Sequence, residues 1–307
     1  MYISKGDIMS LFYHLDELLK EKKLTRTYLQ NKLGISSKTM AKFSKNESVS
    51  LNTIALLCSE LGCQIEDLVE LEKGISSFLS NLLEERKMKL SNGLYHELQV
   101  LFAYNSNRIE GSALSENDTR YIYETNTVDG SNNTDDIIEV ANHFKAFDYI
   151  LDSIFEPIGE DLIKKLHSIL KSSTSDSRLE WFNVGEYKKK KNIVGGSDTS
   201  APKDVELHIR KLLLDYLAIQ NKSFEDIVDF HYKFEKIHPF QDGNGRVGRL
   251  LMFRECLKRE ITPFIIEDDL KMYYYRGLRE YNNLREYLID TAKASQDTMI
   301  KLIQRFE

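Results

Sequence analysis

The stretch EKIHPFQDGNGRVGRLLMF, residues 235–253, constrains this chain more than any other. Upstream of it, apolar residues at spacings of three and four predict a helix with a buried face over 224–237. Pro239 disfavours helical geometry at His238, so we expect His238 at a helix end, facing out of the core. A histidine has a reference pKa of about 6.5 and is largely neutral at pH 7. It can therefore accept a proton, as a general base must.

The loop that follows His238 has the composition of an anion site. Gly243 and Gly245 lack a Cβ, so the backbone can adopt positive φ and turn its N–H groups toward one point. Arg246 is expected to open the next helix, whose N-terminus adds N–H groups and a partial positive charge. Arg249 shares a helical face with Arg246, and guanidinium forks suit phosphate oxygens. Asp242 offers the carboxylate that Mg²⁺ usually takes together with phosphates. The stretch predicts a nucleotide site with a base at its edge.

Taken one at a time, these features also fit a structural histidine, a plain turn and arginines paired with carboxylates. Their joint occurrence in one order resembles the signature of the Fic family, which is His, any, Phe, any, Asp or Glu, Gly-Asn-Gly-Arg, two residues, Arg. The matching residues are His238, Phe240, Asp242, Gly243, Asn244, Gly245, Arg246 and Arg249. The resemblance extends over about residues 94–285.

Family members typically transfer the AMP part of ATP to a Ser, Thr or Tyr hydroxyl of a protein. The resemblance implies that His238 deprotonates the target hydroxyl and that Asp242 holds magnesium. It also implies that the backbone from Gly243 to Arg246 binds the phosphates and that Arg249 holds the γ-phosphate. ATP and Mg²⁺ are therefore the expected cofactors, and the partner is a target protein, which includes the chain itself.

Residues 186–196 predict a β-hairpin, because NIV favours strands and is followed by a Gly pair. The hairpin resembles the family's flap, which pairs with an extended target segment by strand addition. Val194 would lie at its end, near the nucleotide. We interpret lysines 188–191 as a solvated charge run rather than as phosphate contacts. Three further residues resemble adenosine-contacting positions of the family, with core aromatics as the alternative: Tyr274, Tyr275 and Asn282.

The segment SNRIEGS at 106–112 resembles a second family pattern, that of the subgroup with an N-terminal inhibitory helix. Ser106 and Glu110 occupy its two defined positions, and an ion pair from Glu110 to Arg249 would occupy the fork meant for the γ-phosphate. A hydrogen bond to a charged group contributes about 1.5–3 kcal/mol, enough to weaken or misorient ATP roughly ten- to a hundredfold. The alternative is an ordinary surface carboxylate. AMP removal and phosphate transfer at the same site remain alternative activities.

The N-terminal segment LTRTYLQNKLGISSKTMAKF, residues 24–43, predicts two short helices. The first covers 27–33, Gly34 permits a left-handed turn, and Ser36 caps a second helix that runs to about residue 43. This is the helix-turn-helix plan, and its spacing resembles the Cro/repressor type of DNA-binding domain. The residues that would face the major groove of duplex DNA are Ser37, Lys38, Thr39 and Lys42.

The charge of this segment is polarised. Residues 1–50 carry nine Lys and Arg against five Asp and Glu, a net +4, while residues 51–75 carry one against five, a net −4. The alternative to DNA binding is therefore a small helical module for dimerisation or protein binding. A composition break near Lys73 and Gly74 sets the expected domains at 1–73 and 74–307.

Helical periodicity dominates the whole chain, so the expected fold class is mainly α, with a helical Fic domain, its hairpin flap and a small helix-turn-helix domain. The clearest apolar patterns cover residues 11–19, 51–61, 94–102, 137–150, 205–216, 227–237 and 250–257.

A length of 307 residues suggests about two domains. No apolar run approaches the roughly 20 residues of a membrane span, which argues against a membrane partner. Three cysteines without metal or redox spacing are read as reduced thiols of a cytoplasmic protein. The net charge of −6 disfavours nonspecific nucleic-acid binding by the whole chain. The prediction is an autoinhibited adenylyltransferase fused to a DNA-binding module; its rival is a transcriptional regulator whose Fic domain senses nucleotide. The oligomeric state stays open.

Overall fold

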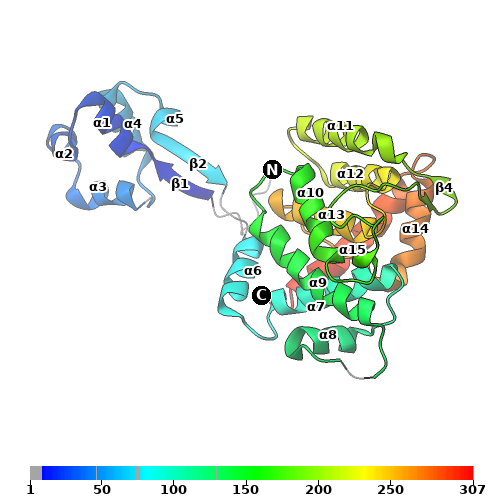
Figure 1. Cartoon of the computed structure of the whole chain (residues 1–307). Helices are drawn as coiled ribbons and strands as arrows, with labels where there is room; N and C mark the ends of the chain where they lie inside the picture. Colours follow the sequence, from blue (N-terminus) through cyan, green and yellow to red (C-terminus); the bar gives the residue numbers. More distant parts are fainter. Residues whose placement is uncertain (1–8, 46, 74–76, 129, 307) are drawn as a thin grey trace. The chain divides into compact units, whose positions relative to one another are not determined.

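The computed structural model describes residues 9–45, 47–73, 77–128 and 130–306, and most of that length is helical (Figure 1). The mainly α fold class is thereby confirmed. The chain divides into two compact units, 1–81 and 82–307, and the division falls inside α6 (Ser77–Met88). The boundary expected between residues 73 and 74 adjoins 74–76, which lie outside the described residues, and it stays a prediction.

The first unit is a small helical cluster with one pair of strands. Its elements are β1 (Met9–Tyr13), α1 (Leu15–Lys22), α2 (Arg26–Leu33), α3 (Ser37–Ser44), α4 (Leu51–Leu61), α5 (Ile65–Leu68) and β2 (Val69–Lys73). The side chains of Thr25, Ser36 and Ser50 accept hydrogen bonds from backbone N–H groups at the starts of α2, α3 and α4. The predicted helix-turn-helix is confirmed, with Gly34 left-handed at φ 68° between α2 and α3.

The helix predicted over residues 11–19 is wrong in its first part. Residues 9–13 form β1, which pairs antiparallel with β2 over the whole length of both strands. This pairing joins segments more than fifty residues apart, and such tertiary contacts override a local helical pattern. The Tyr13 ring packs edge-on against Phe43, 4.7 Å between centroids, which ties β1 to the core of the unit.

The second unit is built around α13 (Asn244–Lys258). The helices packed on α13 are α7 (Leu94–Ile109), α9 (Thr134–Asp152), α10 (Glu160–Lys171) and α12 (Phe224–Ile237) (Figure 1). The remaining helices are α8 (Glu116–Thr125), α11 (Val205–Ala218), α14 (Lys271–Glu280) and α15 (Glu286–Ile303), with 3₁₀ turns η1 (Asp176–Arg178), η2 (Pro202–Asp204) and η3 (Asp268–Leu270). Since α13 is buried along nearly its whole length, the residues at its N-terminus are held in fixed positions.

Helix α7 is a core helix, with twelve of its sixteen residues buried. Its C-terminal end is also tied to the last third of the chain. Tyr275 Oη donates to the Ile109 carbonyl at 2.9 Å, and Lys271 Nζ donates to the Arg108 carbonyl at 3.2 Å. The two residues that precede Glu110, the C-cap of α7, are therefore held by α14.

The predicted hairpin is present but shorter than expected. Its strands are β3 (Ile193–Val194) and β4 (Ser197–Asp198), joined by Gly195 and Gly196, both at positive φ. The hairpin expected over residues 186–196 begins only at Ile193 and extends to Asp198, because side-chain contacts rather than a ladder fix residues 186–192. Lys188 donates to Asn192 Oδ1 and Thr199 Oγ1, both at 2.7 Å.

None of the helices in the described ranges combines the length and apolar character needed to cross a bilayer.

Candidate active site

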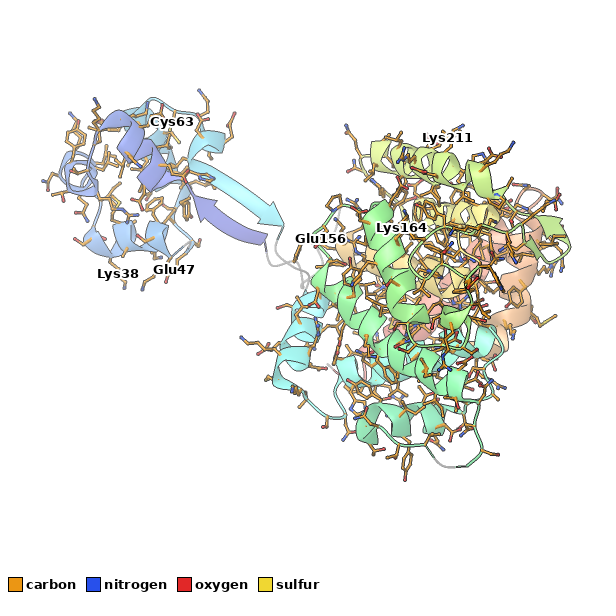
Figure 2. The ribbon with its side chains drawn as sticks, in the orientation of Figure 1. Lys38, Glu47, Cys63, Glu156, Lys164 and Lys211 are labelled. Carbon is orange, nitrogen blue, oxygen red and sulfur yellow. The ribbon has the colours of Figure 1, made fainter. Side chains whose placement is uncertain are left out.

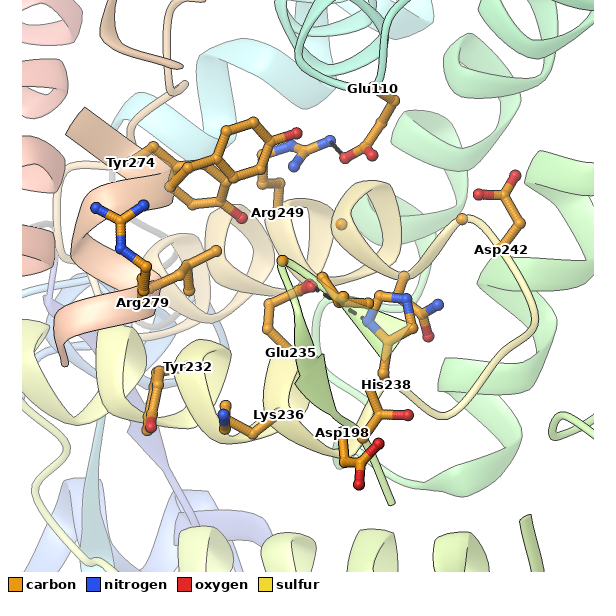
Figure 3. Close-up of a pocket in the computed structure, with 18 of the residues that line it drawn as sticks. Glu110, Asp198, Tyr232, Glu235, Lys236, His238, Asp242, Arg249, Tyr274 and Arg279 are labelled. Atoms are coloured by element: carbon orange, nitrogen blue, oxygen red, sulfur yellow. Dashed lines mark hydrogen bonds and ion pairs between the residues drawn. The ribbon is translucent and has the colours of Figure 1, made fainter. Parts of the chain in front are cut away.

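A pocket of about 540 Å³ lies where α12 ends and α13 begins. Its walls come from the end of α7, the β3–β4 hairpin, the loop between α12 and α13, and α14. Among the lining residues are Glu110, Val194, Glu235, His238, Asp242, Gly243, Asn244, Gly245, Arg249, Tyr274 and Tyr275 (Figure 3). Most residues predicted from the sequence to form the site are thus brought together from these four parts of the chain.

His238 terminates α12 in the left-handed conformation, at φ 52° and ψ 64°. Its backbone N–H donates to the Phe234 carbonyl at 2.9 Å, and its side chain faces the pocket with only 14% exposed. Burial, and next the charge of Lys188, lowers the pKa of His238 to about 4. The imidazole is therefore neutral at pH 7 and able to accept a proton.

Glu235 is the pocket residue that sequence reasoning missed. Its Oε2 lies 3.8 Å from His238 Nδ1, and its side chain is 11% exposed. Burial, and next the negative charge of Glu110, raises the pKa of Glu235 to about 8, against the opposing effect of Arg249. The carboxyl is therefore protonated at pH 7. Its position three residues before His238 and four after His231, on a helix face of mostly buried residues, was the available signal.

The glycine loop leads into a helix N-terminus as predicted, with one correction to its geometry. Helix α13 begins at Asn244, two residues earlier than expected, after Gly243 at φ 77°. The Asn244 side chain accepts from Phe240 N at 2.8 Å and donates to Phe240 O at 3.0 Å, which fixes the loop. The helix N-terminus thus presents its first backbone N–H groups at the pocket.

The fork of Arg246 does not face the pocket, which corrects the expectation that both arginines share a phosphate-binding face. Arg246 is buried and bonds Glu139, Asn107 Oδ1 at 3.2 Å and Asp242 Oδ2 at 3.1 Å. A nearby carboxylate on α9, absent from the motif, decides this orientation. The contribution of Arg246 to an anion is thus limited to its backbone and charge.

Asp242 lies at the opposite end of the pocket from Tyr274 (Figure 3). Burial would raise the pKa of Asp242, but the cations of Arg246 and Lys171 hold it well below its usual value. The described residues contain no group of three or more His, Cys, Asp or Glu that could hold a metal. A single ionised carboxylate beside an anion site still fits Mg²⁺, because this ion is usually bound by one or two carboxylates plus phosphate oxygens.

Arg249 forms an ion pair and hydrogen bonds with residues at the end of α7. Its Nη2 lies 2.6 Å from Glu110 Oε1, its Nε donates to Ser106 Oγ at 3.0 Å, and its Nη2 also donates to Ser106 O at 2.9 Å. Burial would lower the pKa of Arg249, but the ion pair with Glu110 more than offsets it. A Cβ built on Gly245 would collide with the Glu110 carboxylate. That carboxylate therefore lies directly against the first turn of α13.

The residues expected around adenosine divide into two groups. Tyr274 and Tyr275 line the pocket, and Tyr274 Oη bonds His231 Nε2 at 2.8 Å within the core. Asn282 is exposed and does not line the pocket. Its side chain lies beside that of Tyr232 instead. Val194 lines the pocket at the tip of β3 and is 44% exposed.

The four lysines at residues 188–191, just before β3, are not all exposed to solvent. Lys189, Lys190 and Lys191 are exposed, but Lys188 is 3% exposed, and burial lowers its pKa to about 8. The interpretation of a solvated run is wrong for Lys188, whose ammonium group also lies 3.4 Å from the Ile237 carbonyl, next to His238.

The residues predicted to contact DNA lie along α3. Ser37 and Lys38 are exposed, and the Lys38 side chain extends away from the helix (Figure 2). Thr39 is half-buried and bonds the capping Ser36, while Lys42 Nζ donates to the Ser48 carbonyl at 3.1 Å.

Family models match both units. A model described as the Fic/DOC family matches residues 157–256, and one described as a Cro/C1-type HTH DNA-binding domain matches residues 14–74. Protein adenylyltransferase Fic of Drosophila sechellia is 27% identical over 205 residues, which cover 64% of this chain and 40% of that protein. The protein of the same name from Nematostella vectensis is 28% identical over 213 residues, covering 64% and 47%. The chain thus matches less than half of the length of these relatives.

Solved structures share the fold. Fic-1 from C. elegans matches with a TM-score of 0.60 at 20% identity, over 95% of this chain and 92% of that one. A Fic-domain-containing signalling protein from Bacteroides thetaiotaomicron matches with a TM-score of 0.59 at 20% identity, over 74% and 94%. Together with the two family models, this shows that the chain carries a Cro/C1-type helix-turn-helix domain over residues 14–74 and a Fic domain that includes residues 157–256.

Proposed function

We propose that the chain is an ATP- and magnesium-dependent protein adenylyltransferase that Glu110 holds in an inhibited state. The observation that carries the proposal is a neutral, largely buried His238 in one pocket with a helix N-terminus, an ionised Asp242 and Arg249. Similarity to proteins named protein adenylyltransferase supports the reaction class.

In the proposed reaction, a target hydroxyl oxygen attacks the α-phosphorus of ATP and His238 takes the hydroxyl proton. The bond from the α-phosphorus to the oxygen that bridges to the β-phosphate breaks, and pyrophosphate leaves. The backbone N–H groups from Gly243 to Arg246 bind the phosphates, and Arg249 holds the γ-phosphate once Glu110 has withdrawn. Asp242 would hold Mg²⁺, which supplies charge neutralisation at the phosphates. Tyr274 and Tyr275 form the part of the pocket wall where the adenine would lie. Val194 lies at the edge of the β3–β4 hairpin, where an extended target strand would pair.

Inhibition by Glu110 is supported by the contacts of Arg249. Its outer guanidinium nitrogen is already bonded to Glu110 and to the Ser106 carbonyl. A γ-phosphate needs the same donor, and the Glu110 carboxylate lies against Gly245, in the space where phosphate oxygens would approach. In this proposal, nucleotide and Glu110 compete for the guanidinium group of Arg249 and for the space beside Gly245.

The test is intact mass spectrometry of wild type, Glu110→Gly and His238→Ala after incubation with ATP and Mg²⁺, with a cell lysate assayed in parallel using α-labelled ATP. We expect an AMP adduct that is strongest for Glu110→Gly and absent for His238→Ala. Equal labelling by all three proteins would refute both assignments. Label arriving from the γ position instead of the α position would identify phosphate transfer, and loss of a preformed adduct would identify AMP removal.

A second function, sequence-specific DNA binding by the first unit, is favoured by the exposed residues of α3 and the Cro/C1-type match. A mobility-shift selection on random duplexes at stated salt tests it. Binding that changes with ATP in the absence of turnover would favour the regulator that senses nucleotide over the transferase.

A further inference from the structure

A buried lysine lies beside the Asp242 carboxylate, outside the family motif. Lys171, the last residue of α10, has a side chain that is 2% exposed. Its Nζ lies 2.7 Å from Asp242 Oδ2, 2.5 Å from Glu139 Oε1 and 3.1 Å from Asp176 Oδ2. Burial would lower the pKa of Lys171, but the charges of Asp242 and Glu139 more than offset this, so the side chain is a cation.

These contacts involve only one of the two carboxylate oxygens of Asp242. Lys171 and Arg246 both bond Oδ2, at 2.7 and 3.1 Å, and neither of these bonds uses Oδ1. The side chain nevertheless remains 48% exposed and lines the pocket. One face of the carboxylate is therefore neutralised from inside the protein, while the other remains open to a ligand.

We propose that Lys171 is a fixed internal counter-ion that suppresses binding of a divalent cation by Asp242 alone, so that the site takes Mg²⁺ only together with the phosphates of a nucleotide. This inference rests on the proposed function, in which Asp242 is the protein's metal ligand.

The physical reason is the balance of charge around one carboxylate. A divalent ion at Asp242 is repelled by Lys171 and Arg246, two buried cations that lie within 3.1 Å of one oxygen of the same carboxylate and that water screens poorly. Glu139 and Asp176 offset part of that positive charge, but both are themselves bonded to Lys171. A polyphosphate adds several negative charges and further oxygen ligands, which restores a favourable site for Mg²⁺.

The test measures metal binding directly, using Mn²⁺ as the probe and the free-ion electron paramagnetic resonance signal as the readout. The full chain is titrated with Mn²⁺ alone, and then in the presence of an ATP analogue with a methylene between the α- and β-phosphates. Lys171→Met removes the ammonium and keeps the apolar stem, while Lys171→Gln keeps a hydrogen-bond donor. Lys165→Met is the matched control, because Lys165 is an exposed lysine on the same helix.

We expect Lys171→Met and Lys171→Gln to bind Mn²⁺ without nucleotide at least about tenfold more tightly than wild type. Lys165→Met should equal wild type, and adding Asp242→Asn to either Lys171 variant should remove the gain. Thermal melts identify a variant that has not folded, in which case the other variant decides the result.

The outcomes separate this inference from the proposed function. If both Lys171 variants bind Mn²⁺ no more tightly than wild type, while Asp242→Asn weakens Mn²⁺ binding in the presence of the analogue, the inference is overturned and Asp242 remains the ligand. If Asp242→Asn has no effect on Mn²⁺ binding with the analogue, the metal role of Asp242 in the proposed function fails, and this inference fails with it.

Discussion

Replacing Glu110 by Gln tests competition between the protein's own carboxylate and nucleotide. The change keeps the side-chain shape and removes the charge that lies 2.6 Å from Arg249 Nη2. Hydrogen bonds to charged groups contribute about 1.5–3 kcal/mol, and the 30% exposure of Glu110 places this one in the lower part of that range, at about 1.5–2 kcal/mol. If ATP must displace this contact, its affinity should rise roughly ten- to thirtyfold in Glu110→Gln.

The same contact should stabilise the protein when nucleotide is absent. Arg249 is 2% exposed, and in the variant it would keep its bonds to Ser106 but lose the negative charge that pairs with its guanidinium group. A loss of about 1.5–2 kcal/mol corresponds to a fall in Tm of about 3–8 °C for a unit of this size. Binding of the analogue returns an anion to Arg249, so the rise in Tm on binding should be larger in the variant than in wild type.

Isothermal titration calorimetry with the methylene analogue and Mg²⁺ gives the affinities, and differential scanning calorimetry gives the Tm values. Glu116→Gln is the control, because Glu116 forms a more exposed ion pair, with Arg120 at 3.4 Å, and lies outside the pocket wall. A Tm that falls while the affinity stays at the wild-type value would refute the competition, since Glu110 would then be a structural partner of Arg249 only.

Three further outcomes are expected. Since burial lowers the pKa of His238 to about 4, its proton-accepting form is already complete at pH 5.5, and AMP transfer should be flat from there to pH 7, below the pKa of about 8 of the neighbouring Glu235; initial rates with α-labelled ATP that decrease as the pH is lowered from 7 to 5.5 would contradict this. Gly245→Ala places a Cβ 2.8 Å from Arg249 Nη1 and in the space of Glu110, so calorimetry should find analogue binding at least about tenfold weaker in a protein with an unchanged circular dichroism spectrum. Lys38→Ala should weaken binding to a selected duplex uniformly and reduce the salt slope by about 1; an unchanged slope would remove Lys38 from the interface.

Local chemistry in the sequence predicted the parts of the structure that depend on neighbouring residues. The turn at Gly34 and the cap at Ser36 follow from backbone and side-chain rules that act over three or four residues. The end of α12 at His238 follows in the same way from Pro239. The ion pair of Glu110 with Arg249, 139 residues apart, came from the family pattern rather than from such rules.

What the sequence did not predict depends on contacts between distant elements. The β1–β2 pairing joins the two ends of the first unit and replaced an expected helix. The burial of Lys188 and the inward turn of Arg246 depend on oxygen acceptors from other segments. Lys171 carried a usable signal, since it follows Ile163 and His167 by eight and four residues and so continues the buried face of α10.

The burial of α7 limits how the proposed inhibition by Glu110 can be relieved. Withdrawing the whole helix would expose twelve buried residues, which amounts to unfolding the domain rather than switching it. By contrast, Glu110 at the C-cap is 30% exposed and Gly111 follows it at φ 104°, so this end of the helix can change conformation without exposing the buried residues. We therefore expect Glu110 to leave and return to Arg249 through a local change at the end of α7, while the rest of the domain keeps its structure. The fraction of open molecules then sets a basal rate of transfer, and a ligand that acts on the Tyr275–Ile109 contact can raise that rate without moving the rest of the domain.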